Sequence, residues 1–157
     1  MKQVFVSKSA SSAEDAAREL IRVGPVIPVV ITSLTTGEKV LTKALIDTGA
    51  QSNCISPRLA KRLSLNIIGD TWIGGVSSNN EIAKEKVDTV MGMLRPGALT
   101  VDIPCEFATP RFSTGDDQID ILLGRPFLQN FDMHYEGSFG RFSLEWLPPA
   151  LVYQSDD

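Results

Sequence analysis

The segment ALIDTGAQ, residues 44–51, is an apolar run that ends on a charged residue. Ala44, Leu45 and Ile46 are typical of a buried strand, and Asp47 follows them directly. A carboxylate at the inner end of a strand is costly unless another group compensates for its charge. Taken alone, the segment leaves two interpretations open: Asp47 is a turn residue that caps a loop, or it has a partner and a chemical function.

The composition is typical of a soluble globular protein. The chain has 157 residues, enough for one domain with a core of its own. Hydrophobic residues make up 43% and charged residues 22%, which is unlike a disordered chain. The net charge of -4 and the pI of about 5.0 argue against nucleic acid or an anionic membrane as the main partner.

The sequence also bears on location and cofactors. It contains no apolar run as long as a membrane span, and its first residues lack the apolar core of a signal peptide. Cys54 and Cys105 are too few for a disulfide scaffold, and we expect both to be buried as small apolar side chains. We therefore expect an intracellular, cytoplasmic protein that binds no membrane, no metal and no other cofactor.

The chain divides into three expected parts. Residues 1–24 form an N-terminal extension, residues 25–147 the main domain, and residues 148–157 a flexible tail. Ser11 and Glu14 fit a capping box ahead of apolar residues at helical spacing, which predicts a helix in the extension. This helix is either a docking element or a partly ordered leader, and the sequence leaves both open.

The main domain has the pattern of short strands. A turn signal at residues 35–37 separates two apolar strands, so a β-hairpin leads to Asp47. Ser56 and Pro57 predict the start of a short helix, and Pro126 predicts another. Further strands are expected around residues 71–76, 81–91, 99–108, 119–123 and 142–146. The predicted fold is mostly β, a closed or folded-over sheet with two or three short helices.

The Asp-Thr-Gly sequence at residues 47–49 is a candidate catalytic motif. One carboxylate cannot both activate a water molecule and protonate the scissile group, but two carboxylates that share a proton can. Gly49 would let backbone amides approach the carboxylate, and the Thr48 hydroxyl would hold the loop by a hydrogen bond. Three such letters are generic, but an apolar strand before them and Ala50-Gln51 after them make this occurrence more specific.

Three segments together resemble the retropepsin-like aspartic proteases, which comprise retroviral and retrotransposon proteases and their cellular relatives. ALIDTGAQSNCIS (residues 44–56) with the helix PRLAKRL (57–63) resembles the active-site segment. IDILLGRPFL (119–128) is similar to the family's two-hydrophobic-Gly segment, whose strand passes behind the active-site loop. WIGGVSSNN (72–80) resembles the glycine-rich flap that closes over a bound peptide. The order of the segments is that of the family, and the resemblance covers roughly residues 25–147.

The resemblance implies a retropepsin-like acid protease half: a closed β-barrel-type fold with one active-site loop, a flap hairpin and a short C-terminal helix. The catalytic residues that it implies are Asp47, Thr48 and Gly49. The substrate-binding residues that it implies are Ala50, Gln51, Gly74, Gly75, Val76 and Leu122. Gly124 and Arg125 are implied as structural support, since a glycine permits strand and loop to cross closely.

The chain departs from the family pattern in two places. Retroviral members carry an acidic residue that pairs with the Arg of the bracing segment, whereas this chain has Gln51. The partner of Arg125 is therefore open, although the side-chain carbonyl of Gln51 can accept its hydrogen bond. The interval between flap and bracing strand is longer than in compact retroviral enzymes, which favours a retrotransposon or cellular member.

The chain contains only one Asp-[Ser/Thr]-Gly sequence, so it supplies half of a two-carboxylate site. By two-fold symmetry, Asp47 would meet Asp47 of a second copy in a homodimer. We therefore expect an aspartic endopeptidase that processes a retroelement polyprotein or a cellular protein target. The alternative is a catalytically inactive retropepsin-fold module that dimerises or binds peptides.

Several residues keep an alternative interpretation. Gly74 and Gly75 could be an ordinary hairpin turn, or the turn could lie at residues 79–80. Leu122 could line a substrate pocket or belong to the core, and Trp72 could pack on the flap or in the core. Cys54 with the single histidine, His134, would make a thiol protease, although nothing local in the sequence favours it.

Overall fold

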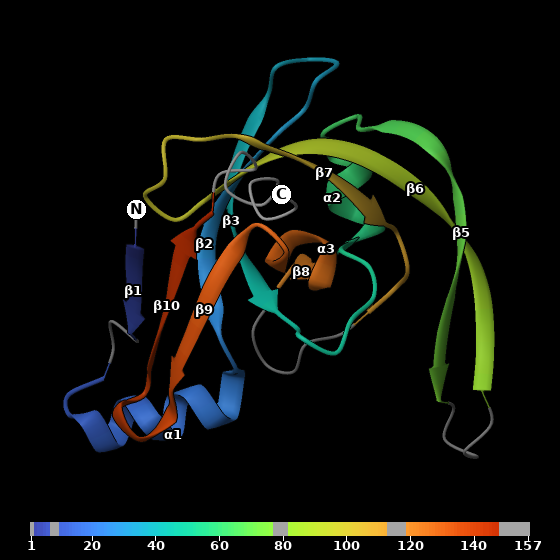
Figure 1. Cartoon of the computed structure of the whole chain (residues 1–157). Coiled ribbons are helices and arrows are strands. Elements are labelled where there is room, and N and C mark those ends of the chain that lie inside the picture. Colours follow the sequence, from blue (N-terminus) through green and yellow to red (C-terminus); the bar gives the residue numbers. More distant parts are fainter. Residues whose placement is uncertain (1, 7–9, 77–81, 113–118, 148–157) are drawn as a thin grey trace, which may run out of the picture.

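The computed structural model describes residues 2–6, 10–76, 82–112 and 119–147 (Figure 1). Its elements are, in chain order, β1 (Lys2–Val6), α1 (Ala13–Val23), β2 (Val26–Thr32), β3 (Lys39–Ile46), β4 (Cys54–Ile55), α2 (Pro57–Arg62), β5 (Asn66–Val76), β6 (Ile82–Pro96), β7 (Ile103–Ala108), β8 (Ile121–Leu123), α3 (Arg125–Leu128), β9 (Phe131–Glu136), the 3-10 turn η1 (Gly137–Phe139) and β10 (Arg141–Trp146). No helix in these ranges is long and apolar enough to cross a membrane.

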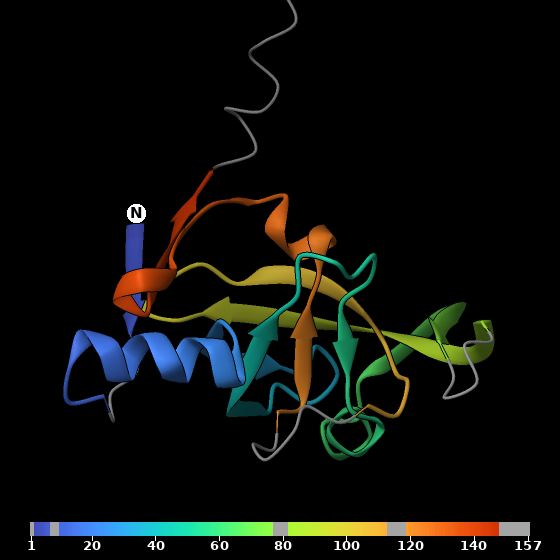
Figure 2. The same ribbon diagram turned by 90° about the horizontal axis from the view of Figure 1, so that it is seen from below.

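Within the described ranges, the strands β2, β3, β8, β4, β7 and β6 form a closed barrel, because β6 pairs back onto β2. Large apolar side chains that are fully buried fill its interior, among them Ile27, Ile31, Leu94, Phe107 and Ile121. The fold is therefore mostly β and closed, as predicted. Figures 1 and 2 both show α1 at one end of the barrel and the β5–β6 hairpin projecting at the other.

The short strand β8 occupies a central position in this barrel. It runs parallel to β3, with Ile46 opposite Leu123, and antiparallel to β4, with Cys54 opposite Leu122. It therefore lies between the two strands that flank the loop at residues 47–53. This is the crossing that the resemblance implied for the bracing segment.

A second sheet, in the order β1-β10-β9, joins the two ends of the described chain. Neither β1 nor β9 was expected from the sequence. Lys2 lies opposite Glu145, and the side chain of Gln3 accepts a hydrogen bond from the Ala98 N–H at 2.7 Å. Residues this far apart in sequence leave no local pattern, so the N-terminal strand was missed.

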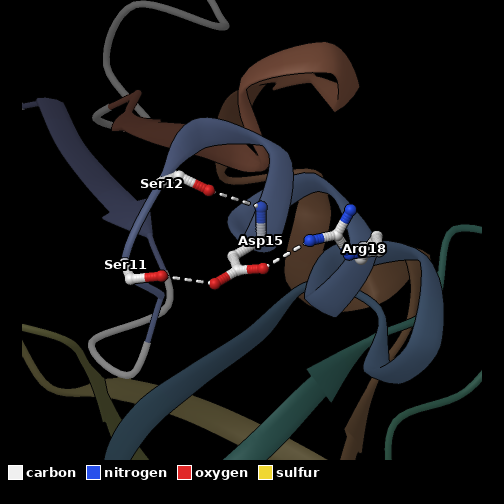
Figure 3. A network of polar contacts seen from close by, with 4 residues as sticks. All are labelled: Ser11, Ser12, Asp15 and Arg18. Carbon is white, nitrogen blue, oxygen red and sulfur yellow. Dashed lines mark hydrogen bonds and ion pairs between the residues drawn. The ribbon is translucent and has the colours of Figure 1, made fainter.

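Helix α1 confirms the helix prediction, but its cap lies one residue later than expected. Ser12, rather than Ser11, is the N-cap, and its hydroxyl accepts the Asp15 N–H at 3.1 Å. Ser11 donates to the Asp15 carboxylate at 2.5 Å, and Arg18 pairs with the same group (Figure 3). These bonds, with that from Ser11 the largest cause, lower the pKa of Asp15. Leu20 packs into the barrel core, which attaches α1 to the main domain.

The remaining local predictions vary in accuracy. The hairpin before Asp47 and the Ser56 N-cap of α2 are confirmed. The helix α3 begins at Arg125, one residue before the expected Pro126, and β5 and β6 are longer than expected. The expected tail at residues 148–157 lies outside the described residues, and the division of the chain at residue 24 stays a prediction.

At Gly140 the connection between η1 and β10 lies against the backbone of α1. It adopts φ of 63°, and a Cβ there would overlap the backbone of Ala16 and Ala17. We expect Gly140→Ala to lower the free energy of unfolding by ~3 kcal/mol, because backbone strain and overlap both oppose the methyl group. Denaturant titration measures the change, with Gly69→Ala as the control because its Cβ would meet no atom within 4 Å. Equal stability of the two variants would contradict this packing.

Candidate active site

Asp47 begins the loop that connects β3 and β4. Its backbone N–H donates to the Leu123 carbonyl at 2.8 Å, which continues the pairing of β3 with β8 by one residue. Its carboxylate accepts the N–H of Gly49 at 3.0 Å, and its carbonyl accepts the N–H of Ala50 at 3.2 Å. Sequence and structure thus agree that Gly49 lets an amide approach the carboxylate.

The Asp47 side chain is exposed in the single protomer. The expectation of an inward, desolvated charge is therefore wrong for one chain, because the strand ends before the carboxylate and leaves it in solvent. The Thr48 hydroxyl makes no hydrogen bond to another residue in the part of the chain that the structure describes. The loop is held instead by backbone groups and by side chains that approach it from outside.

Arg125 is one of these side chains. Its Nη1 donates to the carbonyl of Thr48 at 3.1 Å, and its backbone N–H donates to the carbonyl of Ala50 at 3.0 Å. The partner that the sequence left open is thus a backbone carbonyl of the loop, and not the side chain of Gln51. A backbone acceptor is present whatever residue occupies position 51, which explains why no acidic residue is needed there.

Gly124 permits the close crossing that the resemblance implied. A Cβ at this residue would lie 2.7 Å from the carbonyl oxygens of Ala50 and Ser52. Carbon and oxygen atoms do not approach so closely without displacement, so any side chain here would push the loop away from β8.

Asn53 was not singled out from the sequence, yet it joins three elements. Its Oδ1 accepts the N–H of Gly124 at 2.9 Å, and its Nδ2 donates to the Glu106 carbonyl at 3.4 Å. Its own carbonyl accepts the N–H of Ala108 at 2.8 Å. Only 3% of Asn53 is exposed. The residue lies between a polar loop and an apolar strand, and the sequence gives no sign of which way it points.

The β5–β6 hairpin contains the residues expected in a flap. Gly74 lies opposite Lys84 and Gly75 opposite Ala83, so both glycines are strand residues and the turn interpretation is wrong. Val76 is the last residue of β5, and the alternative turn at Asn79 and Asn80 lies outside the described residues. Trp72 belongs to the same hairpin and is 62% exposed, which excludes a place in the core.

A small apolar cluster lies apart from the main core, where β4, β6 and β7 meet. Its buried members are Cys54, Val87 and Ala108, and its partly buried members are Ile73, Phe112 and Leu122. Leu122 is thus a partly exposed member of this cluster. Cys54 belongs to this cluster, and the charge of Asp47 contributes to the raised pKa of its thiol. The cluster is therefore close to the candidate catalytic group.

A cavity of about 810 Å³ lies beside the loop, against β7 and α3. Its lining includes Gln51, Ser52 and Asn53 but not Asp47. It is therefore next to the candidate catalytic group without containing it. Across the described ranges, no three His, Cys, Asp or Glu side chains are grouped as metal ligands would be.

The thiols have the properties of buried side chains. Burial, and secondarily the charge of Asp47, raises the pKa of Cys54 to about 11, and burial raises the pKa of Cys105 to about 12. A nucleophilic cysteine needs the opposite shift. His134 is exposed on β9, in the other sheet, opposite Ser143. Neither observation supports the thiol-protease alternative.

Comparison with known families agrees with this geometry. The family model described as aspartyl protease matches residues 29–127, which include the braced loop and β8. The chain belongs to this family. A comparison with curated proteins gave no significant match.

Three solved structures are similar to this chain. The retroviral protease-like domain of Ddi1 from Leishmania major is 19% identical (TM-score 0.43), covering 78% of this chain and 94% of that one. A retropepsin-like aspartic protease from Rickettsia conorii is 17% identical (TM-score 0.45), covering 78% and 92%. The aspartic proteinase from Irpex lacteus is 13% identical (TM-score 0.52), covering 99% of this chain but 49% of that one. The last likeness is one of fold alone.

The proximity of Cys54 to Asp47 can be tested by alkylation. With a pKa of about 11, Cys54 should react with iodoacetamide at pH 8 about 100-fold more slowly than a free cysteine. Asp47→Asn removes a charge that raises this pKa, so it should speed the alkylation of Cys54. Peptide mapping by mass spectrometry separates the two cysteines, and Asp102→Asn is the control. The same Cys54 rate in all three proteins would contradict the proximity.

Proposed function

We propose that this protein is an aspartic endopeptidase that hydrolyses peptide bonds with a water molecule held between Asp47 and Asp47 of a second copy. The observation that carries the proposal is the exposed Asp47 carboxylate at the start of a loop braced by β8. Membership in the aspartyl protease family supports a protease-type function.

The homodimer follows from the number of carboxylates. The chain has one Asp-Thr-Gly sequence, and catalysis of this kind needs two carboxylates. An isologous two-fold interface brings the same residue of both copies together. The exposure of Asp47 in one protomer supports this assembly, because a carboxylate that meets a partner copy must be accessible.

In the proposed dimer the two carboxylates share one proton, since like charges so close do not both ionise. The ionised Asp47 takes a proton from the water as it attacks the scissile carbonyl, and the protonated one donates to the carbonyl oxygen. The N–H of Gly49 would stabilise the ionised form by the hydrogen bond that it already makes. Arg125 supports the loop from behind through the backbone carbonyl of Thr48.

The substrate would be a polypeptide in extended conformation, bound by main-chain hydrogen bonds in the manner of an added strand. Ala50 and Gln51 would contact it from the loop. Gly74, Gly75 and Val76 would cover it from the hairpin as a flap. Leu122 and the apolar cluster at β4 would accept an apolar side chain. A retroelement polyprotein and a cellular protein are both substrates of this description.

Replacement of Asp47 tests the chemistry. Asp47→Asn keeps the shape of the side chain but removes the shared proton, so peptide-library cleavage between about pH 3 and pH 7 should fall by at least ~10³-fold. Asp102→Asn is the control, because Asp102 is an exposed ion-pair partner of Arg95. Equal cleavage by Asp47→Asn and wild type would contradict catalysis by Asp47. Cleavage by neither would favour the alternative, an inactive dimerisation or peptide-binding module.

Mixing tests the assembly. With the wild-type concentration fixed, an equal amount of Asp47→Asn protein should reduce activity to about half after subunit exchange, because mixed dimers carry one carboxylate of the pair. The mixture is compared with one that contains Asp102→Asn, which should leave activity undiminished. Sedimentation velocity reports the oligomer directly. If the protein is a strict monomer that still cleaves, and the Asp47→Asn protein does not change its activity, the site shared between two copies is contradicted.

A further inference from the structure

The contacts of Asn53 determine which way its amide points. The Gly124 N–H can only donate, so the atom 2.9 Å from it must be the carbonyl oxygen of the amide. The Glu106 carbonyl can only accept, so the atom 3.4 Å from it must be the amide nitrogen. Both neighbours thus select the same orientation. Among residues of this size, only one with an acceptor and a donor side by side satisfies both.

The position of these bonds ties Asn53 to Asp47. The Asp47 N–H donates a hydrogen bond to the carbonyl of Leu123. The side-chain oxygen of Asn53 accepts a hydrogen bond from the N–H of Gly124, the residue after Leu123. The two ends of the loop are therefore attached to consecutive residues at the end of β8. At the Asp47 end the attachment is a backbone bond, which only a proline substitution would remove. At the other end it is a side-chain bond, which is open to mutation.

The hydrogen bond between the Gly124 N–H and the Asn53 side chain is buried, so its loss would be costly. Asn53 is 3% exposed, and Gly124 is itself buried. Without the Asn53 oxygen, the Gly124 N–H would lose its partner away from water, where an unsatisfied donor is unfavourable. The loop end would then shift or admit water, and the shift would reach Asp47 through the short loop.

We propose that Asn53 is a positioning residue for Asp47: its amide clamps the end of the catalytic loop between β8 and β7 and so fixes the direction of the carboxylate. The catalytic consequence rests on the proposed protease function, whereas the clamp itself does not. Asn53 touches neither water nor substrate in this role, and it acts through the backbone of residues 47–53.

The variant Asn53→Asp tests the clamp with a pH-dependent outcome. A protonated carboxyl can accept from Gly124 and donate to the Glu106 carbonyl, as the amide does. An ionised carboxylate cannot donate, and it would face the Glu106 carbonyl in a buried site. Burial should raise the pKa of the new carboxyl. The clamp should therefore be intact at low pH and fail as pH rises through that raised pKa.

Other charged groups on the surrounding elements are few. Asp47 lies on the same loop, Glu106 on β7 and Arg125 on α3. The thiols of Cys54 and Cys105 have pKa values of about 11 and about 12, so they stay neutral across the tested range. The two carboxylates would oppose ionisation of the new carboxyl and the guanidinium would favour it. The wild-type protein has the same groups. The ratio of variant to wild-type kcat at each pH therefore reports the titration of the new carboxyl alone.

Cleavage kinetics give the first readout. The ratio of variant to wild-type kcat should be near one at about pH 4 and fall at least ~10-fold by about pH 7, with KM changed by less than ~3-fold. Asn130→Asp is the matched control, because the Asn130 amide also donates to a backbone carbonyl, that of Phe127 at 3.0 Å, without touching the loop. Its ratio should stay constant with pH. Asn53→Ala, which lacks both groups, should be impaired at every pH.

Amide hydrogen exchange followed by NMR gives a second readout that needs no activity. In Asn53→Asp the protection of the Gly124 and Ala108 N–H groups should match wild type at about pH 4 and fall at least ~10-fold by about pH 7. Protection in β1 and β10 should not change, which distinguishes loss of the clamp from unfolding. If wild type fails to cleave but this pattern appears, the protease proposal fails and the clamp stands. A kcat ratio or a protection pattern independent of pH in Asn53→Asp would overturn the clamp.

Discussion

The structure depends on the bonds between the end of β8 and the loop at residues 47–53. Leu123, Gly124 and Arg125 contact the loop in succession, through a backbone acceptor, a backbone donor and a guanidinium. The constraint behind these bonds is steric, because only glycine at position 124 lets the strand pass within hydrogen-bonding distance of the loop. The barrel around β8 holds this strand in place, and the loop takes its shape from the strand.

Much of this arrangement could be predicted from the sequence. The apolar strand before Asp47, the hairpin that leads to it and the Ser-Pro start of α2 are local patterns, and each was confirmed. The bracing role of Gly124 came from resemblance, and the close approach of Ala50 and Ser52 explains it physically.

The rest depended on partners that lie far away in the sequence. Strand β1 is defined by β10 at the opposite end of the chain. The partner of Arg125 is a backbone carbonyl, which no residue type reveals. Asparagine is a residue type typical of loops. Asn53 is buried and hydrogen-bonded only because β7 and β8 meet around it. The exposure of Asp47 was mispredicted for a related reason, since burial is set by what lies opposite a strand end.

The exposed carboxylate of Asp47 has a consequence for how the proposed protease activity would be regulated. In the proposed dimer, each protomer alone would be catalytically silent, because it supplies only one carboxylate of the pair and that carboxylate is exposed. Folding and activation would then be separate events, and activation would be bimolecular. At protomer concentrations far below the dissociation constant, the rate of cleavage would grow with the square of the concentration. A high local concentration of the chain, for example through tethering or co-assembly, would then activate it, as removal of a propeptide activates other proteases.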